Sequence, residues 1–179
     1  MIIEKFDQDL SKNLYKLWNR LPSGSYFPPA VKACDITKAD GGTRTLGIPT
    51  VSDRIAQEVV RSVLEPEFEK AFDEDSYGYR PNKSALDAIG QTRKRYQNWL
   101  IEFDIKGMFD NIDHNLLMKA VRRHTTNKWV ILYIQRWLSA DMQLEDGTKI
   151  KRLGGVPQGG VITTAIKLRE SDGLYCKIR

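Results

Sequence analysis

The segment "LIEFDI" (residues 100–105) sets the strongest limit on what this 179-residue chain can fold into. Apolar and acidic residues alternate along it, so it is predicted to form a strand with one apolar face and one polar face. Asp104 lies on the polar face, near the end of the strand. Burying a carboxylate in that place costs free energy unless a cation or a hydrogen-bond donor binds it. The segment therefore predicts a half-buried strand and a partner for Asp104.

The first part of the chain predicts a helix followed by a hairpin. Apolar residues at helical spacing predict the helix over residues 1–20. The hairpin follows over residues 33–50, with its turn at "DGG" (40–42) and its end at Pro49.

A longer helix is predicted to begin at Ser52. Ile55, Val59 and Val63 are spaced by one turn and form an apolar stripe along it. Pro66 is expected to kink or end this helix, because proline lacks an amide hydrogen and its ring clashes with the preceding turn.

Later segments carry clear signals for helix starts and turns. Ser84, with Asp87 three residues later, has the pattern of a capping box. Asp113 is placed to cap a helix over the apolar residues that follow it. A further helix is predicted over residues 128–140, and "MQLEDGTKIKRL" (142–153) predicts a hairpin that turns at its "DG" pair.

The order of these elements lacks a regular alternation of strand and helix, which predicts an α+β fold with a mostly antiparallel sheet packed against helices. The length allows one domain or two closely joined lobes. No apolar run approaches the ~20 residues that span a bilayer, and the first ten residues carry acids where a signal peptide has bases. With Cys34 and Cys176 interpreted as free thiols, the chain is expected in the cytoplasm and away from membranes.

Charge is distributed unevenly along the chain. Residues 1–90 hold 12 Lys and Arg against 14 Asp and Glu, whereas residues 91–179 hold 16 against 9. This asymmetry favours a polyanionic partner, because Lys and Arg gain affinity by releasing condensed counterions. Arg93, Lys94 and Arg95 are candidate nucleic-acid contacts, and further basic clusters occur at "RRH" (122–124) and "KIKR" (149–152). A solvated basic face is the alternative interpretation.

Four segments carry a resemblance to a known family. They are "GGTRTLGIPTVSDRIAQEVV" (41–60), "SYGYRPNKSALDAI" (76–89), "FDIKGMFDNIDH" (103–114) and "GGVPQGGVI" (154–162). In this order, and at these separations, they resemble the reverse transcriptases of bacterial group II introns and their retron-like relatives. The resemblance implies a right-hand polymerase fold in which this chain supplies the fingers and part of the palm.

The resemblance also implies how the chain is divided. Residues 1–98 would form the fingers, and residues 99–118 a palm strand with the start of a helix. Residues 119–153 would add fingers and palm helices with a hairpin, and residues 154–179 a partial palm with a divergent tail.

The third segment would supply the metal site. Asp104 is similar to the palm aspartate that binds Mg²⁺, with the backbone carbonyl of Ile105 as a second oxygen ligand; a surface aspartate at a strand end is the alternative. Phe109 is similar to the aromatic residue that lies under the incoming sugar and excludes a 2′-hydroxyl, with core packing as its alternative. Asp110 is expected to be structural, and His114 to pack or to hydrogen-bond locally.

Basic and polar residues would complete the nucleotide site. Arg44 resembles the fingers arginine that grips the triphosphate, since guanidinium donates to phosphate in a fork, and Lys38 would assist it; a solvated edge is the alternative. Gln158 and Gly159 resemble residues beside the incoming nucleotide, although composition alone gives only a glycine-rich turn. Arg80 would either face the template backbone or brace the fingers.

The resemblance ends before the family's second acidic block, in which an aromatic residue and Ala precede two adjacent aspartates. The sequence contains no such block, and from Thr163 onward it departs from the family pattern. Two-metal phosphoryl transfer needs several carboxylates, so the chain is expected to be a fragment of an RNA-directed DNA polymerase that is inactive alone. A non-catalytic RNA-binding module and a self-associating remnant are the alternatives. Expected partners are an RNA template or intron RNA, a DNA primer, a dNTP and a second copy of the chain, with Mg²⁺ weakly bound or absent.

Overall fold

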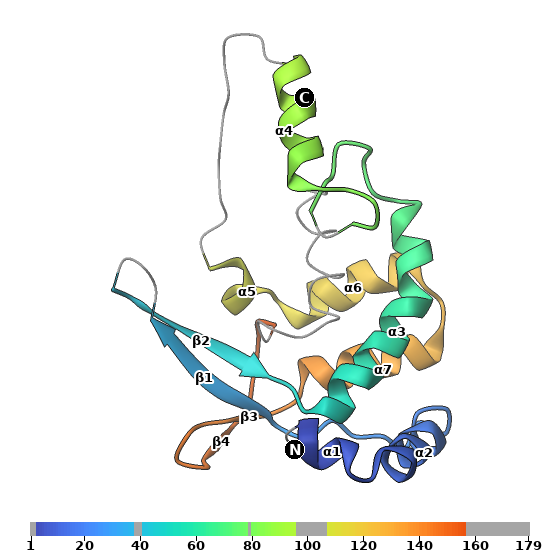
Figure 1. Cartoon of the computed structure of the whole chain (residues 1–179), viewed down its shortest axis with the longest axis vertical. Coiled ribbons are helices and arrows are strands. Elements are labelled where there is room, and N and C mark those ends of the chain that lie inside the picture. The colour runs from blue at the N-terminus through green and yellow to red at the C-terminus, as the bar shows by residue number, and fades with distance from the viewer. Residues whose placement is uncertain (1–2, 38–40, 79, 96–106, 157–179) are drawn as a thin grey trace.

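The structure is a computed structural model that describes residues 3–37, 41–78, 80–95 and 107–156 (Figure 1). In chain order its elements are α1 (Ile3–Asp7), α2 (Leu10–Arg20), β1 (Val31–Thr37), β2 (Thr43–Ile48), α3 (Val51–Glu69), α4 (Ala85–Arg95), α5 (Met108–Asn111), α6 (His114–His124), α7 (Lys128–Leu138), β3 (Met142–Gln143) and β4 (Lys149–Ile150). Helices α2, α3, α6 and α7 gather on one side and the sheet lies on the other, which confirms the predicted α+β fold.

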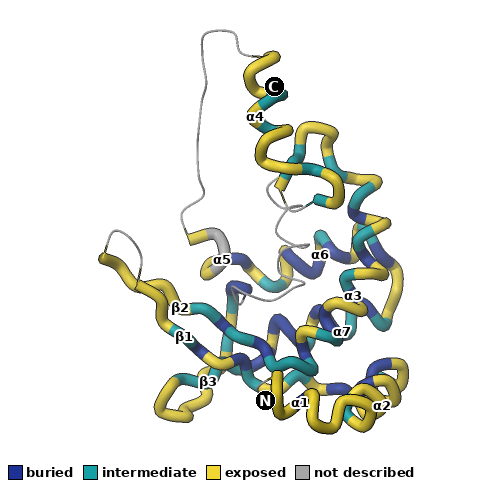
Figure 2. Tube along the Cα trace, viewed as in Figure 1, coloured by how far each residue is buried: buried dark blue, intermediate teal, exposed yellow. Residues whose placement is uncertain are grey.

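The core lies where α3, α6 and α7 meet. Val60 and Leu64 of α3, Leu117 of α6, and Tyr133 and Ile134 of α7 are all buried, and Figure 2 shows the buried positions concentrated on these helices. Helix α7 contributes most because it is apolar on several faces, as expected for a helix at the centre of a domain. Burial of each large aliphatic side chain stabilises the fold by about 1.5–3 kcal/mol.

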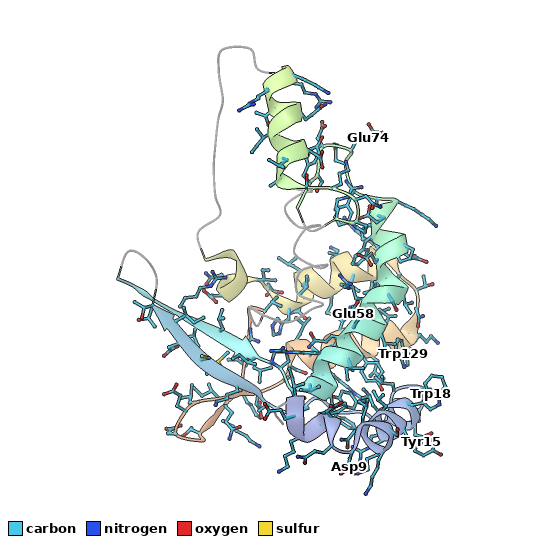
Figure 3. All side chains as sticks on the ribbon, in the orientation of Figure 1. Asp9, Tyr15, Trp18, Glu58, Glu74 and Trp129 are labelled. Carbon is cyan, nitrogen blue, oxygen red and sulfur yellow. The ribbon has the colours of Figure 1, made fainter. Side chains whose placement is uncertain are left out.

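The predicted helix over residues 1–20 is wrong as a single element, because α1 ends at Asp7 and α2 begins at Leu10. The Nδ2 atom of Asn13 donates to the carbonyl oxygen of Phe6 at 2.9 Å, so a side chain occupies an acceptor that a continuous helix would pair internally. Tyr15 and Trp18 project outward from α2 into solvent (Figure 3).

Helix α3 differs from its prediction in two ways. It continues through Pro66 to Glu69, so the proline does not end it. One lost backbone hydrogen bond near a C-terminus is offset by the burial of Leu64 and Phe68 on either side. Val59 and Val63 of the predicted stripe face outward, while Ile55 is partly buried; the residues that pack into the core are Ala56, Val60, Leu64 and Phe68.

The sheet has the strand order β2-β1-β3-β4. Strands β1 and β2 pair antiparallel, as do β3 and β4, so both predicted hairpins are confirmed. Gly147 turns the second hairpin with a φ of 87°, a value that favours glycine. The pair of β1 with β3 is parallel, with Val31 opposite Met142. The predicted strand over residues 100–105 lies outside the described residues.

Two predicted helix caps are confirmed. Ser84 and Asp87 form a reciprocal capping box at the start of α4, with Asp87 Oδ2 2.9 Å from the Ser84 amide and Ser84 Oγ 3.2 Å from the Asp87 amide. Asp113 Oδ1 accepts from the amides of Asn115 at 2.7 Å and Leu116 at 3.0 Å, which fixes the start of α6.

Candidate functional site

Two of the four motif segments are joined by hydrogen bonds between their described ends. The amide of Gly155 donates to the carbonyl oxygen of Ile112 at 2.9 Å. The Nε2 atom of His114 lies 2.8 Å from the carbonyl oxygen of Gly155, so Nε2 carries the proton and donates. Ile112 and Gly155 are buried. We call this arrangement of residues 112–114 and 154–156 the motif junction; it brings together the segments that contain Asp104 and Gln158.

The backbone that leads into the motif junction is fixed from Gly107 onward. Gly107 has a φ of 66°, in the left-handed region that favours glycine. The Nδ2 atom of Asn111 donates to the carbonyl oxygen of Gly107 at 2.8 Å, and a Cβ at position 107 would lie 2.8 Å from that nitrogen. The short helix α5 is therefore held tightly between Gly107 and the capped start of α6. His114 hydrogen-bonds, but its partner is distant in sequence and not local as expected.

Arg152 lies at the edge of the motif junction, half-buried, three residues before Gly155. Burial lowers the pKa of its guanidinium, and the nearby carboxylate of Asp110 partly opposes this effect. Its Nη1 atom is buried and has no hydrogen-bond partner among the described residues. Sequence reasoning placed Arg152 only in a basic cluster, because no local pattern shows that its side chain turns inward.

The base of the first hairpin is held by one buried carboxylate, that of Asp53. Tyr26 Oη donates to Asp53 Oδ1 at 2.5 Å, and Thr50 Oγ1 donates to Asp53 Oδ2 at 2.9 Å. Trp137 Nε1 donates to Oδ1 at 3.4 Å. Burial raises the pKa of Asp53, while these donors favour its ionised form and oppose the rise. We call these four residues the hairpin anchor.

The hairpin anchor was not recognised in the sequence. Asp53 and Thr50 belong to the first motif segment, but Tyr26 comes from the loop before β1 and Trp137 from α7. Because Tyr26 precedes β1 and Thr50 follows β2, the anchor holds both ends of the hairpin that carries Arg44. Burial, followed by the charge of Asp53, raises the pKa of Tyr26, so its hydroxyl remains a donor.

Residues 36–176 match the family described as "Reverse transcriptase (RNA-dependent DNA polymerase)". This chain belongs to the reverse transcriptase family. The match includes α5, the motif junction and three residues of the hairpin anchor, Thr50, Asp53 and Trp137, while Tyr26 precedes it.

The chain is similar to several curated proteins, one of which is encoded by a group II intron. It is 37% identical to Protein YkfC of Escherichia coli K12, over 91% of this chain and 45% of the relative. It is 34% identical to the group II intron-encoded protein LtrA of Lactococcus lactis subsp. cremoris, over 94% of this chain and 29% of LtrA. It is 36% identical to the putative COX1/OXI3 intron 1 protein of Saccharomyces cerevisiae, over 84% of this chain and 18% of the yeast protein. The chain spans less than half the length of each.

A solved structure shares the fold of this reverse transcriptase. The "Partial Cas6-RT-Cas1--Cas2 complex" superposes with a TM-score of 0.60 at 24% identity. The superposition covers 93% of this chain and 29% of that one. At this identity the similarity establishes the right-hand polymerase fold of the region and no more.

Several predicted site residues lie outside the described residues; they are Lys38, Asp104, Ile105, Gln158 and Gly159. Phe109 is the second residue of α5, and the structure describes its backbone only. Arg44 is exposed on β2, opposite Ile36 of β1. Within the described ranges, no three Asp, Glu, His or Cys side chains gather as metal ligands.

Arg80 of this reverse transcriptase is fully engaged with its neighbours. It forms an ion pair with Glu69, with Nη2 3.0 Å from Oε2, and Nη1 donates to the carbonyl oxygens of Asp73 at 2.6 Å and Ser76 at 3.0 Å. Its guanidinium also lies 5.0 Å from the ring centre of Phe72. Of the two roles left open for Arg80, these contacts fit the bracing one.

Helix α4 presents the basic cluster to solvent. Arg93, Lys94 and Arg95 are all exposed, and α4 has no buried residue. Arg95 forms an exposed ion pair with Asp75, which is worth little in stability because solvent screens it. Figure 1 shows α4 standing apart from the helical core. No helix in the part of the chain that the structure describes is long and apolar enough to cross a membrane.

Proposed function

We propose that this chain forms the fingers and the first part of the palm of an RNA-directed DNA polymerase of the group II intron type. Within the complete polymerase domain, it positions an RNA template, a DNA primer and a dNTP for nucleotidyl transfer. The observation that carries this proposal is the motif junction, because it ties the segment of Asp104 to the segment of Gln158 through Ile112, His114 and Gly155.

The proposed metal site uses the carboxylate of Asp104 and the carbonyl of Ile105 as ligands for Mg²⁺. Bound divalent ions would activate the primer hydroxyl and stabilise the charge on the transferred phosphate. The hydrogen bonds of Asn111 and Asp113 support this role, since they fix the backbone that directly follows the two proposed ligands in the sequence.

The nucleotide would be held from two sides. Arg44, with Lys38, would bind the triphosphate from the hairpin, and the hairpin anchor supports this because it fixes both ends of that hairpin. Gln158 and Gly159 would lie beside the incoming base and sugar. Phe109 would exclude a 2′-hydroxyl and so favour deoxynucleotides.

The nucleic acid would be bound through Arg93, Lys94 and Arg95 of α4. Their exposure supports this role, since a basic helix surface can contact phosphates without rearrangement. The same surface favours a second candidate function, an RNA-binding module that acts without catalysis.

A chimaera tests the proposed function. In the chimaera, this chain replaces the matching segment of LtrA. The two proteins align over 94% of this chain. We expect the chimaera to extend a DNA primer on an RNA template with dNTPs, and we expect Asp104→Asn to abolish extension while leaving RNA binding intact. A folded chimaera that extends equally well with Asp104→Asn would exclude the proposed metal role. RNA binding without any extension would favour the binding module.

A further inference from the structure

The guanidinium of Arg152 is held beside the motif junction without a complete set of partners. The chain leaves β4 at Ile150 and reaches Gly155, whose amide and carbonyl are both bonded to the segment of Ile112 and His114. Arg152 lies between these two fixed points, and Leu153 beside it is almost fully exposed. The backbone therefore turns the arginine inward while its apolar neighbour points to solvent, the reverse of the usual preference.

The buried position of Arg152 is energetically unfavourable in the absence of a ligand. Its Nη1 is buried and makes no hydrogen bond to the residues that the structure describes, and a buried donor without an acceptor carries a desolvation cost. Asp110 of α5, which is exposed, acts on it as a counter-charge. No ion pair joins Arg152 to Asp110 within the described ranges. The guanidinium remains protonated despite its burial.

We propose that Arg152 binds a phosphate group of the ligand that this reverse transcriptase holds at the motif junction, with Nη1 as the donor. A guanidinium suits this task because its planar set of N–H groups matches phosphate oxygens and stays charged at all working pH values. In the free protein, Asp110 acts as the counter-charge of Arg152. When the phosphate binds, it takes over this role. This inference rests on the proposed function, since that function supplies a phosphate ligand at this place.

The phosphate has two possible sources, the backbone of the primer–template duplex and the triphosphate of the nucleotide. Both offer the same oxygens to Arg152. An internal role for Arg152, as a weak partner of Asp110 alone, makes a different prediction. Under the internal role, Asp110→Asn weakens the structure and leaves anion binding unchanged. Under the phosphate role, Asp110→Asn strengthens anion binding, because it removes a repelling charge.

The test measures the affinity of the full chain for two probes, a labelled DNA primer–RNA template duplex at several salt concentrations, and inorganic tripolyphosphate. We expect Arg152→Gln to weaken binding of at least one probe roughly tenfold. If the source is the duplex, the slope of log affinity against log salt falls by about one. If the source is the triphosphate, only tripolyphosphate binding falls. Lys12→Gln, at an exposed position of α2 outside the basic clusters, is the control for loss of one positive charge and should change both affinities little.

Arg152→Lys keeps the positive charge but loses the planar guanidinium, so it should retain part of the affinity for the probes. If Arg152→Gln does not fold, the comparison is made between wild type and Arg152→Lys. Equal binding of both probes by wild type, Arg152→Gln and Arg152→Lys would overturn the inference and leave the proposed function standing. Failure of the wild-type chain to bind either probe would also overturn the inference, while primer extension by the chimaera tests the proposed function separately.

Discussion

The Oη atom of Tyr26 donates a 2.5 Å hydrogen bond to Oδ1 of Asp53, and both side chains are buried. This bond joins the loop that leads into β1 to the first turn of α3. Thr50 adds the end of β2, and Trp137 adds α7. Together with the pairing of β1 and β3, this carboxylate therefore fixes the base of the hairpin against the helical core.

Replacing Asp53 tests this dependence. We expect Asp53→Ala to lower the free energy of unfolding by about 2–4 kcal/mol, because it leaves two buried donors, Tyr26 and Trp137, and the half-buried Thr50 hydroxyl without their acceptor. Tyr26→Phe removes one donor and should cost about 1 kcal/mol. Urea unfolding monitored by circular dichroism gives both values. An Asp53→Ala chain as stable as the Tyr26→Phe chain would show that the carboxylate does not hold the hairpin.

The pH dependence of stability should carry the signature of Asp53. Because burial raises its pKa in the folded state, the folded chain binds this proton more readily than the unfolded chain. The stability that the Asp53 proton contributes is therefore lost as the pH rises through the pKa of Asp53 in the folded state. It is regained as the pH falls toward the pKa of an aspartate in the unfolded chain, about 3.9. The free energy of unfolding of wild type, measured relative to Asp53→Asn, should increase as pH falls from 7 toward 4. A constant difference across this range would contradict the prediction.

Two glycines offer a matched pair of substitutions with opposite signs. Gly107→Ala should lower stability by about 1–2 kcal/mol, because the residue has positive φ and its Cβ would meet Asn111. Gly90→Ala should raise stability by about 0.5–1 kcal/mol, since it lies in α4 with open space around the added methyl. Thermal unfolding compares the two. Equal effects of the same sign would show that α5 is not held as described.

His114→Phe probes the motif junction directly. The substitution keeps a ring but removes the donor to Gly155, so we expect a loss of about 1 kcal/mol and faster hydrogen exchange at the Gly155 amide. Leu116→Ala, at an exposed neighbouring position, should leave that exchange rate unchanged. Protection of Gly155 that persists in His114→Phe would mean that the bond to Ile112 suffices to hold the junction.

Features set by neighbouring residues were predictable from the sequence. The box of Ser84 and Asp87, the Asp113 cap and the glycine turn at 147 depend on residues within one or two turns of each other. The family was recognisable for a related reason, since each motif segment is continuous in the chain. A motif that is continuous in the chain can be recognised from its residues and their spacing, without knowledge of the fold.

Features that depend on which surface becomes buried were not predictable. Helix α3 has two apolar stripes, and only packing against α7 decides that Leu64 is buried and Val63 is exposed. The hairpin anchor and the inward turn of Arg152 likewise unite residues from distant segments, so no local spacing reveals them. Asp53 and Arg152 are the two residues for which the structure adds most to the sequence.

The parallel pairing of β1 with β3 has a consequence for how the protein is made. Val31 emerges from the ribosome long before its partner Met142, and β1 has one open edge throughout that interval. The hairpin of β1 and β2 can close early, but the four-stranded sheet must wait until α7 has been synthesised and packed. During translation, the edge of β1 that β3 later covers is therefore open to pairing with another strand.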